Sequence, residues 1–142
     1  MSDSPAGATP DRVVARPAAT ELLTKLTEMH GGLMIHQSGG CCDGSAPMCY
    51  PVGEYRIGQR DVLVGELELP SPLPPVRVWI AGDQFEVWKH TQLILDVVPG
   101  RGAGFSLEAP EGVRLLSRAR AFTDAENDLL AATPPQTGAD FD

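Results

Sequence analysis

GGLMIHQSGGCCDGSAPMCYP, residues 31–51, holds the end of a predicted helix, a short strand and a glycine-rich loop with all three cysteines of the chain. Its first two glycines end the helix, because glycine adopts the backbone conformation that closes a last helical turn without a steric cost. In the strand that follows, Leu33 and Ile35 face one way, and Met34 and His36 face the other. A helix that passes directly into a strand indicates a mixed α and β domain.

The segment before this stretch, RPAATELLTKLTEMH, predicts a helix over residues 18–30, with Pro17 in its first turn. Proline suits that turn because its missing N–H has no helical partner there. Apolar residues recur at helical spacing on one face: Leu22, Leu23, Leu26 and Met29. Residues 1–16 are small, polar and proline-bearing, which predicts a disordered N-terminal arm.

Beyond the cysteine loop, short apolar segments alternate with turns, which predicts several strands. EYRIGQRDVLVGELEL, residues 54–69, predicts a strand, a turn at Gly58 and a second strand. VRVWI, residues 76–80, and QLILDVVPG, residues 92–100, predict further strands. Residues 81–91 are ambiguous between a helical turn and a strand.

The C-terminal part of the chain predicts a second helix. Thr123 and Glu126 have the spacing of a capping box, in which each residue bonds the other's backbone N–H. The order of helix, several short strands and helix predicts an α+β fold, mainly β, with small antiparallel or mixed sheets. We expect a single globular domain over residues 17–132 and a flexible tail over residues 133–142.

Charge and hydropathy exclude two classes of partner. The formal net charge is −8, from 19 acidic and 11 basic residues, so the surface repels nucleic acid phosphates. The longest apolar runs, such as LILDVV, are far shorter than the roughly 18 residues of a membrane span. The start MSDSPAGATPDR is polar and acidic and lacks the basic beginning and apolar run of a secretory signal, so we expect a cytoplasmic protein.

Clustered cysteines in the cytoplasm favour metal binding or redox chemistry, because disulfides rarely persist there. Cys41 and Cys42 are adjacent, and Cys49 follows Cys42 by seven residues. Thiolates suit Zn²⁺ and iron–sulfur clusters, and imidazole suits Zn²⁺ or iron. The predicted metal ligands are Cys41, Cys42, Cys49 and His36. They could form a closed site in one protomer, or two cysteines could be completed by a second protomer of a homodimer.

Two other interpretations of the cysteines stay open at this point. They could be small buried apolar residues, as free cysteines often are. Alternatively, one of them could be a thiolate nucleophile with His36 as its base. His36 itself fits a hydrogen-bonded strand histidine as well as a ligand.

The remaining polar candidates are better explained by structural roles. His90 is expected to be hydrogen-bonded, with a role as ligand or proton carrier as the alternative. His30 lies at a helix C-terminus, where the dipole favours a cation. Asp43 and Asp83 are turn formers, although Asp43 could also serve as an oxygen ligand or base beside the thiols. GRGAGF lacks the lysine and spacing of a phosphate-binding P-loop, which leaves Arg101 as a candidate anion contact.

Two long segments resemble a known bacterial family. GGLMIHQSGGCCDGSAPMCYP and FEVWKHTQLILDVVPGRGAGFSLEAPEGVRLL are similar to DUF779, small proteins of unknown function often encoded beside aldehyde dehydrogenases. The resemblance covers residues 18 to about 128. It implies an association with alcohol or aldehyde oxidation, and it implies no established activity and no agreed site residues.

The element order also resembles the HesB-like A-type carriers of iron–sulfur clusters, in which a helix and a strand lead into a GGCSG turn. GGCCDG takes that place here, so Cys41 corresponds to the first carrier cysteine. The carriers have two more cysteines in a C-terminal CGC segment, and this chain has none after Cys49. This second resemblance therefore implies a HesB-like fold more than a cluster-carrying activity.

Together, these features predict a metal- or iron–sulfur-binding accessory protein that associates with an aldehyde dehydrogenase. One alternative is a small thiol-dependent enzyme that acts on an aldehyde or a disulfide. The other is a docking subunit of the dehydrogenase that needs no metal.

Overall fold

The computed structural model describes residues 9–37, 47–54, 56–100 and 109–141. The strands are β1 (Val13–Ala15), β2 (Leu33–Gln37), β3 (Met48–Pro51), β4 (Val62–Leu67), β5 (Val76–Ile80), β6 (Thr91–Pro99), β7 (Val113–Ala121) and β8 (Gln136–Thr137). The α-helices are α1 (Pro17–His30), α2 (Gly82–Trp88) and α3 (Asp124–Ala131), and the 3-10 helices are η1 (Ala109–Glu111) and η2 (Gly138–Phe141).

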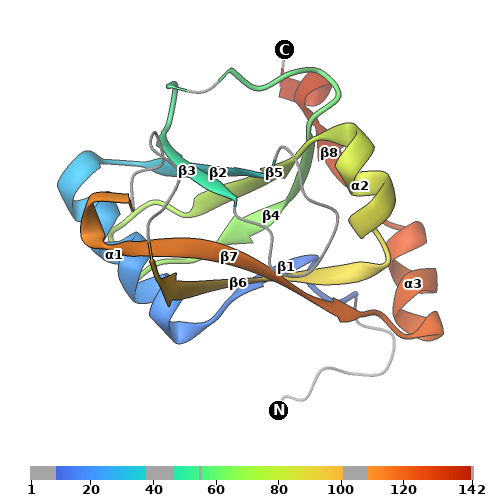
Figure 1. The fold of residues 1–142 in the computed structure, drawn as a ribbon. Helices are drawn as coiled ribbons and strands as arrows, with labels where there is room; N and C mark the ends of the chain where they lie inside the picture. The colour runs from blue at the N-terminus through green and yellow to red at the C-terminus, as the bar shows by residue number, and fades with distance from the viewer. Residues whose placement is uncertain (1–8, 38–46, 55, 101–108, 142) are drawn as a thin grey trace.

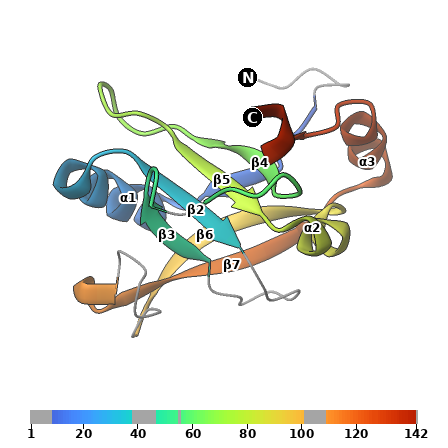
Figure 2. The ribbon, with the colours of Figure 1, turned by 90° about the horizontal axis from the view of Figure 1, so that it is seen from above.

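The strands form two sheets that stack as layers, with α1 at one end and α2 and α3 at the other (Figure 1). The three-stranded sheet has the order β1-β6-β7, and the five-stranded sheet has the order β3-β2-β5-β4-β8. β1 runs parallel to β6 and β2 runs parallel to β5, whereas the other pairs are antiparallel. Figure 2 shows the same layers from above, with β6 passing under β2. This architecture confirms the predicted α+β fold, mainly β, with mixed sheets.

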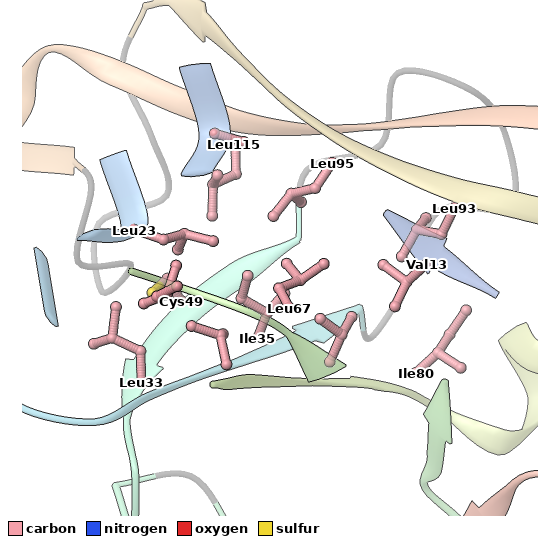
Figure 3. Packing of buried hydrophobic residues seen from close by; sticks show 14 of the residues in the cluster. Val13, Leu23, Leu33, Ile35, Cys49, Leu67, Ile80, Leu93, Leu95 and Leu115 are labelled. Carbon is pink, nitrogen blue, oxygen red and sulfur yellow. The ribbon is translucent and has the colours of Figure 1, made fainter. Parts of the chain in front are cut away.

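One apolar core fills the space between the two sheets (Figure 3). α1 contributes Leu23, β2 contributes Ile35, and the three-stranded sheet contributes Leu95 and Leu115, all fully buried. Burying one such side chain contributes about 1.5–3 kcal/mol relative to leaving it in water. One face of β2 therefore packs into the core, and the other face points to the outer side of the five-stranded sheet.

A buried hydrogen bond fixes the last residue of β2. Ser117 on β7 donates from Oγ to Oε1 of Gln37 over 2.7 Å, and both residues are fully buried. Buried polar groups are costly unless they are paired, so this bond holds the two sheets in one arrangement. The end of β2, which precedes Cys41 and Cys42 in the sequence, is thereby tied to the opposite layer.

The first predicted helix is confirmed by α1, but its buried side differs in one residue. Leu23 and Leu26 are buried as expected, whereas Met29 is 57% exposed. The buried positions include Thr27, which the apolar pattern did not select. The helix turns its apolar side toward β2 and β6, so the last turn projects past the core.

Both ends of the chain contain more structure than predicted. Val13 in β1 belongs to the core and pairs with Leu93 of β6, although residues 1–16 were predicted to be an arm. At the other end, β8 pairs with β4 and continues into η2, although residues 133–142 were predicted to be a flexible tail. Both segments are short, and their order comes from pairing with distant strands rather than from their own residues.

Two predictions for the middle of the chain are resolved. The predicted strand before Gly58 is wrong, because residues 56–61 form a loop and turn between β3 and β4. The ambiguous segment 81–91 forms α2 and then enters β6. Among the described residues, no helix is both long and apolar enough to cross a membrane.

Candidate functional site

The outer face of β2 carries the only predicted metal ligand of this strand, His36. Its side chain is 2% exposed and lies on the opposite face from Ile35. Across the sheet His36 pairs with Met48 of β3 and with Trp79 of β5. The imidazole is thus held between two neighbouring strands, one residue before the end of β2.

Asp61 meets this histidine from the loop that precedes β4. His36 Nε2 lies 3.0 Å from Oδ1 of Asp61. The second carboxylate oxygen, Oδ2, accepts the backbone N–H of Gly58 at 2.8 Å. Both oxygens are occupied, and the Asp61 side chain is 14% exposed, so the carboxylate is held in one orientation.

The C-terminal strap, residues 136–141, holds the backbone of Asp61 in place. The backbone N–H of Gly138 donates to the backbone oxygen of Asp61 over 2.8 Å. The chain passes so close that a Cβ added to Gly138 would lie 1.9 Å from the carbonyl oxygen of Gly58. Only glycine fits at this crossing, which keeps the strap against the loop that carries Asp61.

A buried imidazole beside a fixed carboxylate has two chemical uses. The carboxylate only accepts, so the His36 ring donates its Nε2–H to Asp61. That arrangement orients a metal-binding histidine, and it equally orients a general base. The chemistry of the pair therefore depends on what approaches Nδ1.

Cys49 lies on the opposite face of the sheet from His36. In the β2–β3 register Cys49 pairs with Ile35, whereas His36 pairs with Met48. The thiol is fully buried in the apolar core beside Leu23 and Leu33 (Figure 3), and it forms no disulfide. The structure does not bring Cys49 and His36 together. Met48, the partner of His36, points to the outer face, and the next residue of a strand, here Cys49, points to the opposite face.

Cys41, Cys42 and Asp43 lie outside the described residues. The described chain stops at Gln37, four residues before Cys41, and resumes at Pro47, which is fully buried.

Cys49→Ser should destabilise the fold and leave any bound metal unchanged. The substitution places a hydroxyl in the apolar core and is expected to lower the free energy of unfolding by about 1–3 kcal/mol. Cys49→Ala, which adds no polar group, should cost about 1 kcal/mol. Urea unfolding and elemental analysis of both variants check this. If the Cys49→Ser protein were as stable as the wild type but had lost its metal, Cys49 would have to be a metal ligand.

The other polar candidates occupy separate places. His90 Nδ1 lies 3.2 Å from Oδ1 of Asn127 on α3, which agrees with the expected hydrogen-bonded role. His30 is the exposed last residue of α1, and Asp83 in the first turn of α2 pairs with Arg60 at 3.2 Å. Arg101 lies outside the described residues. In the described part of the chain, no three His, Cys, Asp or Glu side chains are grouped to hold a metal ion.

Asp61 is the candidate site residue that sequence reasoning missed. It lies 25 residues from His36 and belongs to no recognisable motif. The available signal was weak: an acidic residue directly before the apolar run VLV, close to a glycine turn. The parallel pairing of β2 with β5 and the antiparallel pairing of β5 with β4 bring its loop to the end of β2.

Comparisons with known proteins identify a family and no characterised relative. The sequence model of a family described as "Domain of unknown function (DUF779)" matches residues 22–121. No curated protein and no solved structure matches the chain. The resemblance to the HesB-like carriers is accordingly not shown by these comparisons.

Proposed function

Because the chain belongs to the DUF779 family, whose function is unknown, we propose its function from the chemistry around His36. The protein binds a transition metal, Zn²⁺ or iron, or an iron–sulfur cluster. It acts as an accessory protein to an aldehyde dehydrogenase. The observation that carries the metal site is the buried pair of His36 and Asp61.

Metal-binding histidines generally donate their second ring N–H to a carboxylate or carbonyl group, which fixes the tautomer and raises the basicity of the ligand nitrogen. Asp61 provides this partner at 3.0 Å, and Gly58 in turn orients Asp61. Coordination would use Nδ1 of His36, because Nε2 faces the carboxylate. This support exists before any metal binds, so it lowers the cost of organising the site.

The sulfur ligands in this proposal are Cys41 and Cys42. They follow His36 by five and six residues in the sequence, whereas Cys49 points into the core. One imidazole and two thiolates leave one position of a tetrahedral site for a further group. A second protomer or an external thiol would complete the site, which is why a homodimer belongs to the proposal.

The partner follows from the family resemblance. DUF779 proteins are often encoded beside aldehyde dehydrogenases, and an accessory protein with an open metal position suits such an enzyme. It would deliver a metal ion to the dehydrogenase or protect a thiol of that enzyme. Neither role requires the protein to catalyse a reaction itself.

The metal content of protein purified without oxygen tests this function. We expect about one metal ion per chain, or a cluster with a visible absorption band shared between two chains. Cys41→Ser and Cys42→Ser should each lose most of the metal, because sulfur ligands bind Zn²⁺ and iron far better than hydroxyls do. Cys49→Ala is the matched control and should keep the metal. A metal-free wild-type protein, or full metal in Cys41→Ser, would contradict the proposal.

A second candidate function uses the same histidine and carboxylate. An imidazole oriented by Asp61 could take the proton of a cysteine thiol, which makes a nucleophile toward an aldehyde or a disulfide. This enzyme would be metal-free, and one cysteine would react with iodoacetamide much faster than the others. Asp61→Asn would slow that cysteine.

A further inference from the structure

The outer face of the five-stranded sheet also carries a pocket of about 500 Å³. Its floor is formed by Met34 of β2 and by Arg77 and Trp79 of β5. The C-terminal strap closes one side with Phe141, and apolar residues of two loops line the rest. Pockets that bind small organic molecules have volumes of about 300–1000 Å³ and mostly apolar walls.

Aromatic rings give this pocket its chemical character. Trp79 and Phe141 meet edge to face, with their ring centroids 5.6 Å apart and an interplanar angle of 73°. Phe141 remains 45% exposed, although a large apolar side chain is normally covered. The other walls include Val52, Pro74 and Pro75. An apolar or aromatic body placed here would cover the open side of Phe141.

A single ion pair provides the polar contact. Arg77 donates from Nε to Oε2 of Glu66 over 3.1 Å, and its guanidinium lies 5.0 Å from the centroid of the Phe141 ring. Glu66 offsets the charge of Arg77, and the chain as a whole has a net charge of −8. The pair therefore has little net charge to attract an anion, whereas the other N–H groups of the guanidinium could donate to a neutral acceptor.

We propose that this pocket binds a small neutral organic molecule with an aromatic body and one hydrogen-bond acceptor, such as a carbonyl oxygen. The ring packs against Phe141 and Trp79, and the acceptor receives a hydrogen bond from Arg77. The volume, the aromatic walls and the compensated arginine each select this class. This binding does not depend on the metal site proposed above, because it uses none of its ligands.

Three probes of similar size distinguish the contributions of the ring, the acceptor and a negative charge: acetophenone, ethylbenzene and benzoate. The chain has two tryptophans, so its ¹⁵N–¹H spectrum contains two indole N–H signals, which Trp88→Phe assigns. Acetophenone should shift the Trp79 signal and leave the Trp88 signal in place. Ethylbenzene should bind several-fold more weakly, because it offers no acceptor to Arg77. Benzoate should bind no more tightly than acetophenone, because Glu66 already offsets the charge of Arg77.

Two variants then locate the contacts. Phe141→Ala should weaken acetophenone about five- to tenfold, because it removes one of the two aromatic walls. Arg77→Met keeps the apolar stem and should abolish the preference for acetophenone over ethylbenzene. Met29→Ala, which removes an exposed apolar residue of α1, should change nothing. Unshifted Trp79 at saturating acetophenone, tightest binding by benzoate, or unchanged affinity in Phe141→Ala would overturn the proposal.

Discussion

Gly138→Ala is expected to lower the free energy of unfolding by about 3 kcal/mol, the upper part of the usual range for inserting a methyl group into packed structure. The new Cβ would lie 1.9 Å from the carbonyl oxygen of Gly58 and 2.8 Å from its carbonyl carbon. Backbone atoms cannot move aside as a flexible side chain can, so the strap must leave the loop. The hydrogen bond from Gly138 to Asp61 is then lost.

Urea unfolding measures this loss, with Gly32→Ala as the matched control. A Cβ at Gly32 meets Val52 at 3.6 Å and Pro74 at 3.8 Å, which are ordinary contacts. That variant should stay within about 0.5 kcal/mol of the wild type. Faster proteolytic cleavage after residue 132 in Gly138→Ala would show that the strap has detached. Equal stability of the two variants would contradict the close crossing of the strap and the loop.

Asp61→Asn is expected to weaken metal binding 10- to 100-fold, the usual effect of removing a carboxylate that supports a metal-binding histidine. The amide keeps the size of the side chain, but in either orientation its NH2 group replaces one of the two oxygens and faces a donor, either His36 or Gly58. The imidazole then loses the group that fixes its tautomer and orientation. Titration of the metal-free protein with Zn²⁺ against a competing chelator measures the change.

Asp83→Asn is the control for this experiment, because it also removes one acidic charge. Asp83 is paired with Arg60 at the surface, and its side chain is 86% exposed. Its substitution should leave Zn²⁺ affinity within twofold, since exposed ion pairs contribute little. If Asp61→Asn bound Zn²⁺ as tightly as Asp83→Asn does, the carboxylate would have no part in the site. If Asp61→Asn bound Zn²⁺ more weakly but kept the wild-type free energy of unfolding, Asp61 would support the metal site without being needed for folding.

The fold could be predicted where the signal is local. The helix over 18–30 follows from proline, apolar spacing and glycine, and Thr123 with Glu126 does form the capping box that opens α3. β1 and β8 could not be predicted, because two or three residues carry too little pattern and take their order from β6 and β4. Order that comes from a distant partner leaves no periodicity in the segment itself.

The site was only half predictable for a related reason. Sequence spacing selected His36 and the cysteines as neighbours along the chain, but neighbours in a strand alternate between faces. The register of β2 with β3 decides that Cys49 accompanies Ile35 into the core. Nothing local to Asp61 marks it as the partner of His36, since their proximity is a product of strand order.

The alternation of β2 has an evolutionary consequence. Ile35 anchors the layer between the sheets, and His36, the very next residue, carries the polar pair on the outside. Inserting or deleting one residue in this strand would send the imidazole inward and the isoleucine outward. Length changes should therefore be purged from β2 among descendants of this chain and accumulate in exposed turns such as the one around Gly53.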